Sequence, residues 1–115
     1  MKRILLARKL LIDEFSEEII DIQFDELQLR LTIRFKIGFT VYVQFNDFNE
    51  YSYHIQFTQK ANDYLRYDNY DDHWDVVSKP HHFHPRGEKV AVKSPMRGIP
   101  EKDIPYLIDI IMKFL

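Results

Sequence analysis

The sequence contains no cysteine among its 115 residues, so disulfide bonds and thiolate chemistry are excluded. It has only three glycines, and neither a glycine-rich phosphate loop nor a nucleophile elbow is present. No apolar run approaches the roughly 20 residues that a membrane-spanning helix requires. The lack of cysteine is typical of a reducing compartment, and we expect a cytoplasmic protein that does not enter a membrane.

The composition indicates a single folded domain over residues 1–115, because 45% of the residues are hydrophobic and 15% are aromatic. The formal net charge is only −2, but charges of opposite sign are separated along the sequence. Residues 13–26 contain acids and no base. Residues 79–97 contain one acid and five bases, which are Lys79, Arg86, Lys89, Lys93 and Arg97. This basic segment is either a solvated loop or a surface for an anion such as phosphate.

Hydrophobic and polar residues alternate along five successive stretches, and this period of two is typical of half-buried β-strands. The residues between the stretches include Asn, Asp and Gly, which favour tight turns. Short turns between consecutive strands predict an antiparallel meander. The five stretches cover residues 20–24, 27–35, 39–45, 51–57 and 65–68.

One face of this sheet is apolar and requires a cover. Hydrophobic residues recur at helical spacing between Ile104 and Leu115, so we expect a helix over residues 101–114 that lies on the sheet. Residues 2–12 are mostly helix formers without a clean apolar stripe, which leaves both a second helix and an edge strand open. The predicted fold class is α+β: a meander of about five strands covered on one face by the C-terminal helix and, if it forms, the N-terminal one.

The polar side chains of the predicted strands gather on the opposite face of the sheet, because successive residues of a strand point to opposite sides. This face is either an ordinary solvated surface or the floor of a binding site. It leads along the chain into the histidine-rich residues 64–86, which favours a binding site. The set mixes cations, amides, a histidine and a tyrosine: Arg30, Arg34, Tyr42, Gln44, His54, Gln56, Arg66 and Asp68.

Three histidines lie within four positions of a segment framed by two prolines, Pro80 and Pro85. Proline disfavours the helical conformation of the preceding residue, so the segment is expected to be extended. His82 and His84 then share one face, and His81 and Phe83 share the other. Such a pair can bind a metal together with a carboxylate such as Asp68 or Asp72, or act as general acid and base on a phosphodiester, or hydrogen-bond a partner. A histidine-rich surface loop without a function is the remaining alternative.

Four ordered motifs carry a resemblance to a known family. They are Tyr51-x-Tyr53-His54-x-Gln56, Leu65-Arg66-Tyr67-Asp68-Asn69, the single His73, and Pro80-His81-His82-Phe83-His84. Together they resemble the TumE-like toxin family of prokaryotic toxin–antitoxin systems, over about residues 51–95. The resemblance implies a small toxin encoded beside an antitoxin, which inhibits growth through translation. By motif position, the residues that transfer are His54, Arg66, Asp68, Asn69, His73, His81, His82 and His84.

The chain departs from the family pattern at two positions. Tyr67 replaces a common Trp, and Phe83 replaces a Lys. The second change removes a cation from the predicted site, which weakens a phosphate-binding role for that position.

The leading hypothesis is a metal-independent, ribonuclease-like toxin that uses no cofactor. His82 and His84 are the candidate general acid and base, with His54 as a substitute for one of them. Arg66 would stabilise the charge of the pentacovalent phosphate, and Asp68 would orient a histidine or Arg66. The candidate substrate contacts are Asn69, which would also hold a turn, and His73, His81, Lys79, Arg86, Lys89 and Lys93.

Two other hypotheses remain open. The chain could be an interaction module without catalysis, whose polar face docks an antitoxin or another protein. It could also be a metal-dependent or nucleotide-modifying enzyme that uses His82, His84 and an aspartate. The expected partners are a cognate antitoxin and RNA, and self-association of the chain is left open.

Overall fold

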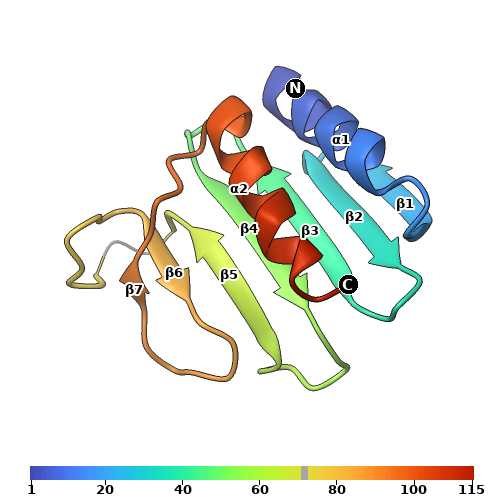
Figure 1. Ribbon diagram of the computed structural model, residues 1–115. Helices are drawn as coiled ribbons and strands as arrows, with labels where there is room; N and C mark the ends of the chain where they lie inside the picture. The colour runs from blue at the N-terminus through green and yellow to red at the C-terminus, as the bar shows by residue number, and fades with distance from the viewer. Residues whose placement is uncertain (71–72) are drawn as a thin grey trace.

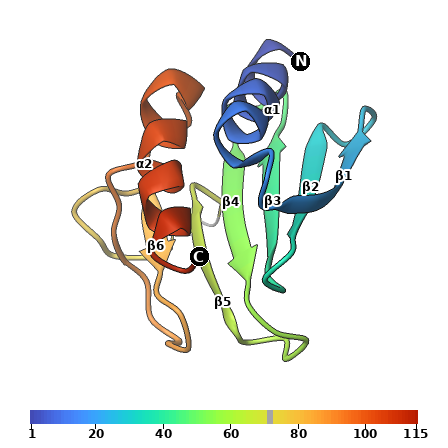
Figure 2. The ribbon, with the colours of Figure 1, turned by 45° about the vertical axis from the view of Figure 1, so that its right-hand side comes forward.

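The computed structural model describes residues 1–70 and 73–115. All described strands form one antiparallel sheet in the order β1-β2-β3-β4-β5-β6-β7, and both helices lie side by side on the same face of it (Figures 1 and 2). The α+β class is therefore confirmed. The elements are α1 (Lys2–Phe15), β1 (Ile19–Asp25), β2 (Arg30–Phe35), β3 (Thr40–Phe45), β4 (Tyr51–Gln56), β5 (Tyr64–Asp68), β6 (His82–His84), β7 (Val92–Lys93) and α2 (Pro100–Met112).

The sheet has seven strands rather than about five, because the histidine segment joins it. His82–His84 pairs with the end of β5 as strand β6, and the two residues of β7 pair with β6. The expectation of an extended segment between the prolines is confirmed. Strands of two and three residues are too short to show an alternating pattern, so their place in the sheet could not be predicted from the sequence.

The N-terminal segment is a helix, which decides between the two alternatives left open by the sequence. Its buried residues are Ile4, Ala7, Leu11 and Phe15, spaced three or four positions apart. The stripe was not evident in residues 2–12 because one of its members, Ala7, is small and its last member lies beyond residue 12. The helix therefore buries a narrow face, to which Leu11 alone of its leucines belongs.

Two hydrophobic residues of the predicted strands do not enter the core. The register shifts between Ile19 and Asp21 of β1, and Ile20 lies exposed at this irregularity. Leu27 is 97% exposed because β2 begins only at Arg30 and the preceding residues form a turn. In this turn Asp25 Oδ1 accepts hydrogen bonds from the N–H groups of residues 27 and 28.

The core lies between the two helices and the apolar face of the sheet. A buried carboxylate, Asp103, joins α2 to this core and to the chain that returns from β7. Its Oδ2 accepts hydrogen bonds from the Tyr53 hydroxyl and from the Gly98 N–H, both at 2.7 Å. Hydrogen bonds to a charged acceptor contribute roughly 1.5–3 kcal/mol each, so Asp103 anchors the connection that follows β6 and β7.

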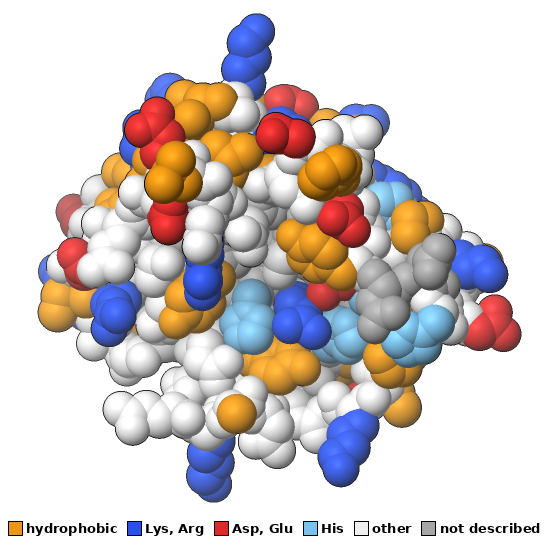
Figure 3. Space-filling model, turned by 180° about the vertical axis from the view of Figure 1, so that it is seen from behind, with side chains coloured by type: hydrophobic (Ala, Val, Ile, Leu, Met, Phe, Trp, Pro, Cys, Tyr) orange, Lys and Arg blue, Asp and Glu red, His pale blue; other side chains and the backbone are white. Residues whose placement is uncertain are grey.

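The other face of the sheet carries the polar side chains of the same strands, as the alternation predicts. Figure 3 shows this face, where histidine side chains and a Lys or Arg side chain gather in a band across its middle. Among residues 1–70 and 73–115, no helix has the length and apolar character needed to cross a membrane.

Candidate functional site

The strand register places His54, Arg66 and His84 in one row across the open face. His54 of β4 pairs directly with Arg66 of β5, and Arg66 pairs directly with His84 of β6. Asp68 and His82 form the next pair along the same two strands. Side chains of directly paired residues are neighbours on one face, so five residues from three strands meet here.

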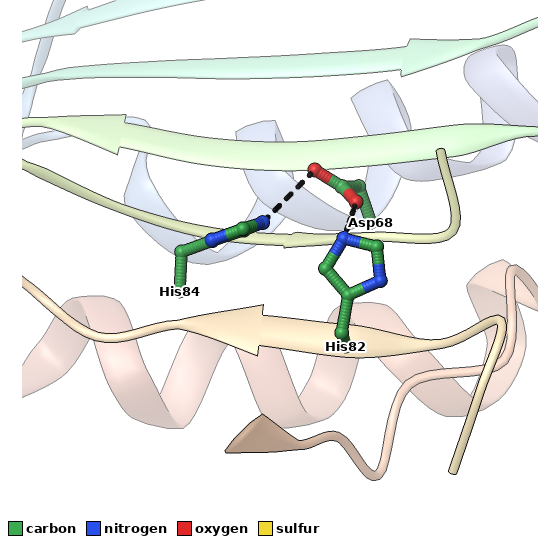
Figure 4. Close-up of side chains that lie close together, drawn as sticks. All are labelled: Asp68, His82 and His84. Atoms are coloured by element: carbon green, nitrogen blue, oxygen red, sulfur yellow. Dashed lines mark ion pairs between the residues drawn. The ribbon is translucent and has the colours of Figure 1, made fainter. Parts of the chain in front are cut away.

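Asp68 and His82 form a buried pair at the centre of the site (Figure 4). Their side chains are almost inaccessible, and His82 Nε2 lies 2.6 Å from Asp68 Oδ1. On the other side of the ring, His82 Nδ1 donates to the carbonyl oxygen of Pro80 at 2.9 Å, because that oxygen can only accept. The contact between His82 Nε2 and Asp68 Oδ1 is a close pairing of opposite charges only when the ring is protonated.

The charge of this pair is set by two opposing effects. Burial is the largest influence on Asp68 and raises the pKa of its carboxyl group, whereas His82 and Arg66 oppose that rise. The two neighbouring groups therefore offset part of the cost of burying the Asp68 carboxylate. The carboxyl group of Asp68 thus lies at the floor of the site without being an isolated charge in the protein interior.

Arg66 is held by the same carboxylate. Its Nε lies 2.7 Å from Asp68 Oδ2, and its guanidinium group lies over the ring of Tyr64 at 5.2 Å. The N–H of Arg66 is not aligned with the carboxylate, so the contact is an ion pair rather than a hydrogen bond, and Asp68 Oδ1 also has no aligned donor among the described residues. One third of the Arg66 side chain is exposed. Its positive charge therefore reaches solvent on the open face.

His84 lies at the border between the buried pair and the surface. Its Nε2 is 3.9 Å from Asp68 Oδ2 (Figure 4), and 8% of the residue is exposed. Its ring meets the ring of His82 edge-on at 4.8 Å and the indole of Trp74 edge-on at 5.6 Å.

A cavity of about 500 Å³ opens over these residues. Its walls include Arg66, Asp68, His82 and His84 together with Trp74, and its opening faces solvent. Neither the cavity nor Trp74 was predicted as part of the site. The presence of the sole tryptophan beside the histidines was the available indication, but the sequence does not show on which side of the segment it packs.

His54 lies beside this cavity rather than in it. Its ring stacks on Tyr64, with ring centroids 4.7 Å apart, and its Nε2 lies 2.9 Å from Gln56 Oε1. Burial lowers the pKa of His54, with Arg66 as a further lowering influence. It lines a second, shallower hollow of about 390 Å³ with Arg30 and Tyr42.

Of three further predicted substrate contacts, two lie elsewhere or serve the fold and one adjoins the site. His81 lies on the helix-covered side of the sheet, where its Nδ1 is 2.9 Å from the Tyr51 hydroxyl. Asn69 joins β4 and β5, since its Oδ1 accepts from the Tyr51 N–H and its Nδ2 donates to the Asn49 carbonyl. His73 packs against Trp74, with ring centroids 4.7 Å apart, and so adjoins the site.

Of the basic residues predicted to contact the substrate, one lines the cavity and the others lie outside it. Lys89 lines the cavity, whereas Arg86 pairs with Asp63 at 2.7 Å and lies over the ring of Phe57. Lys79 is exposed in the turn before β6. Lys93 is exposed on β7, paired in register with His82.

The group of Asp68, His82 and His84 also has the composition of a metal site. One donor atom from each residue falls within 4.8 Å of the others. The backbone carbonyl that accepts from His82 Nδ1 is typical of the second shell of a metal-bound histidine. The guanidinium of Arg66, however, already lies against the carboxylate and opposes a second positive charge there. The other predicted carboxylate ligand, Asp72, lies outside the described residues.

Comparison with known proteins identifies a family. A family model described as Toxin TumE matches residues 3–115. This match extends the resemblance of residues 51–95 to almost the whole chain. No curated protein and no solved structure matches the chain significantly.

Proposed function

The chain belongs to the TumE toxin family, and from this premise we propose that it is the toxin of a toxin–antitoxin module, which cleaves RNA by acid–base catalysis without a metal. The observation that supports this most directly is the row of His54, Arg66 and His84 on the open face. Two imidazoles flank a guanidinium, about 10 Å apart by the usual spacing of strands. This is an arrangement for binding one phosphate between two proton carriers.

In the proposed reaction, neutral His54 accepts the proton of a ribose 2′-hydroxyl as its oxygen bonds to the adjacent phosphorus. Arg66 offsets the negative charge of the pentacovalent phosphate. Protonated His84 donates its proton to the 5′ oxygen as the phosphorus–oxygen bond breaks. The products are a 2′,3′-cyclic phosphate and a 5′-hydroxyl end, and no water or metal is consumed in this step.

The two histidines are assigned by their surroundings. Burial lowers the pKa of His54, so this residue is neutral at physiological pH and suited to accept a proton. His84 lines the open cavity and pairs in register with Arg66, so it lies where a general acid can reach the leaving oxygen of a bound phosphate.

Asp68 and His82 are assigned as positioning residues rather than proton carriers. His82 is 1% exposed, and both of its nitrogens are engaged, by Asp68 and by the Pro80 carbonyl. Asp68 is 2% exposed and contacts both Arg66 and His84. The pair thus fixes the cation and the acid relative to each other, which lowers the entropic cost of reaching the transition state.

The proposed substrate also fits the charges around the cavity. Lys89 at the cavity and Arg30 in the neighbouring hollow add positive charge along the row. Such charges attract a nucleic-acid backbone, so we expect weaker binding at higher salt. Cleavage of cellular RNA would inhibit translation, and the cognate antitoxin would prevent it by covering the site.

The pH dependence of cleavage tests the assignment of His54. A general base must be deprotonated, and its lowered pKa places the acidic fall in rate below pH 6.5, the ordinary value for histidine. We expect kcat/KM to fall on the acidic side only below that pH. His54→Ala should lower the rate and remove this acidic limb. An unchanged acidic limb in His54→Ala would exclude this residue as the base.

A further inference from the structure

The cavity over the site has an aromatic lining that the proposed reaction does not use. Three aromatic side chains from different parts of the chain border it: Tyr64 at the start of β5, Tyr70 after its end, and Trp74. All three are half-buried. Aromatic residues that serve only the core lie on the other face, under the helices. These three instead border an open cavity on the polar face, which requires a different explanation.

The aromatic side chains are in direct contact with the proposed reactive groups. The indole of Trp74 meets the ring of His84 at 5.6 Å. The ring of Tyr64 stacks on His54 at 4.7 Å and lies under the guanidinium of Arg66 at 5.2 Å. A planar group bound in the cavity would therefore be separated from the proposed phosphate position by the width of one side chain. A single nucleotide fits this arrangement, because its planar base is joined to its phosphate through one sugar.

The rim of the cavity supplies groups for the edge of such a base. Asn62 offers both a donor and an acceptor, Glu88 offers acceptors, and Lys89 offers donors. An aromatic wall with a polar rim is typical of sites that bind unpaired bases, since stacking holds the ring and polar groups contact its edge.

We propose that this cavity is a nucleobase subsite, and that the substrate is single-stranded RNA whose base beside the cleaved phosphate is unstacked against Trp74. This inference rests on the proposed function and extends it to the class of substrate. In a duplex both faces of a base are covered by its neighbours and its pairing edge is occupied. A duplex therefore cannot place a base in the cavity, and its phosphates are kept away from Arg66.

The sole tryptophan of the sequence provides a direct probe of this subsite, because all indole fluorescence comes from Trp74. We expect saturable quenching on addition of a single-stranded 2′-O-methyl RNA oligonucleotide, which lacks the attacking hydroxyl and is not cleaved. The same oligonucleotide annealed to its complement should not quench, nor should inorganic phosphate. Equal quenching by the duplex, or by phosphate alone, would overturn the subsite.

Kinetics of Trp74 variants provide the second test. Trp74→Ala removes the stacking of one base on an aromatic ring. The binding free energy of such a stack corresponds to a rise in KM of roughly 10- to 100-fold for a cleavable single strand, with a much smaller change in kcat. Trp74→Phe should keep most of the affinity, because it keeps an aromatic face. Phe48→Ala removes an exposed aromatic side chain that lies outside the lining of the cavity, in the turn between β3 and β4, and is the matched control.

The two sets of results separate this inference from the proposed function. A fall in kcat with unchanged KM in Trp74→Ala would mean that Trp74 only packs against His84, and the subsite would be wrong while cleavage remained established. Saturable quenching by a single strand without any cleavage would support the subsite and contradict the ribonuclease activity.

Discussion

His84→Ala is expected to lower the rate of RNA cleavage roughly 10²- to 10⁴-fold, the range typical for loss of a general acid. The 5′ oxygen would then leave without a proton from the protein. His84 borders the open cavity, so solvent can fill the space of the missing ring. The variant should keep its circular dichroism spectrum, and the loss should appear in kcat rather than in KM.

The matched control is His81→Gln. This histidine stands three positions earlier in the same proline-framed segment, but it faces the helix-covered side and contacts the Tyr51 hydroxyl. Glutamine keeps a hydrogen-bonding group for Tyr51, and cleavage should stay within a factor of about two, since the substituted side chain lies away from the reacting groups. A full rate in His84→Ala, or equal losses in both variants, would remove His84 from the proposed reaction.

The second large effect concerns stability. His82→Ala is expected to lower the free energy of unfolding by about 3–5 kcal/mol at neutral pH, because it leaves the buried Asp68 with only the part-exposed Arg66 as a cation beside it. Denaturant unfolding followed by circular dichroism measures this change. The penalty should shrink as the pH falls, because Asp68 can then bind a proton and lose its charge.

The direction of the pH effect follows from the pKa of Asp68. Burial already raises it above the ordinary 3.8, and loss of His82 removes an influence that opposes the rise. A group whose folded pKa is raised contributes stability below its unfolded pKa, and this contribution is lost as the pH rises through the folded pKa. The free energy of unfolding of His82→Ala should therefore approach that of the wild type near pH 4 and fall below it at higher pH.

The double variant His82→Ala/Asp68→Asn isolates the buried charge from the loss of the ring. Asparagine has nearly the size of aspartate but carries no charge, and Arg66 is exposed enough to be hydrated. The double variant should be more stable than His82→Ala at neutral pH. If it is less stable at every pH, the cost comes from lost packing and the charge argument is wrong.

Much of the site could be predicted from the sequence because strands sort their side chains by a period of two. The alternation placed His54, Arg66 and Asp68 on one face, and the prolines placed His82 and His84 together. The fold class and the covering C-terminal helix followed from the same patterns. These predictions depend only on local spacing, which a single sequence displays directly.

The arrangement across strands could not be predicted in the same way. Nothing in the sequence shows that β6 pairs with β5 in the register that puts His82 against Asp68 and His84 against Arg66. That register decides that His82 is enclosed and His84 borders the cavity. Without it the two histidines looked equivalent, and both were predicted to carry protons.

The basic segment shows a related limit. Arg86 and Lys89 were equivalent in the sequence, as two cations placed near the histidines. In the structure Arg86 pairs with Asp63 and lies over the ring of Phe57, and both of these residues are distant from it in the sequence. Lys89 instead lines the cavity. Charge alone indicated the attraction of an anion, but the tertiary contacts determine which cation can supply it.

The central claim is a metal-independent cleavage of RNA, and the chemistry of the product ends tests it most directly. Purified protein would be incubated with single-stranded RNA in excess EDTA, with His84→Ala prepared and assayed in parallel. We predict 2′,3′-cyclic phosphate and 5′-hydroxyl ends from the unaltered chain, and no cleavage where the 2′-hydroxyl is methylated. Intact RNA under all conditions, or cleavage that requires an added divalent metal and leaves 5′-phosphate ends, would contradict the account.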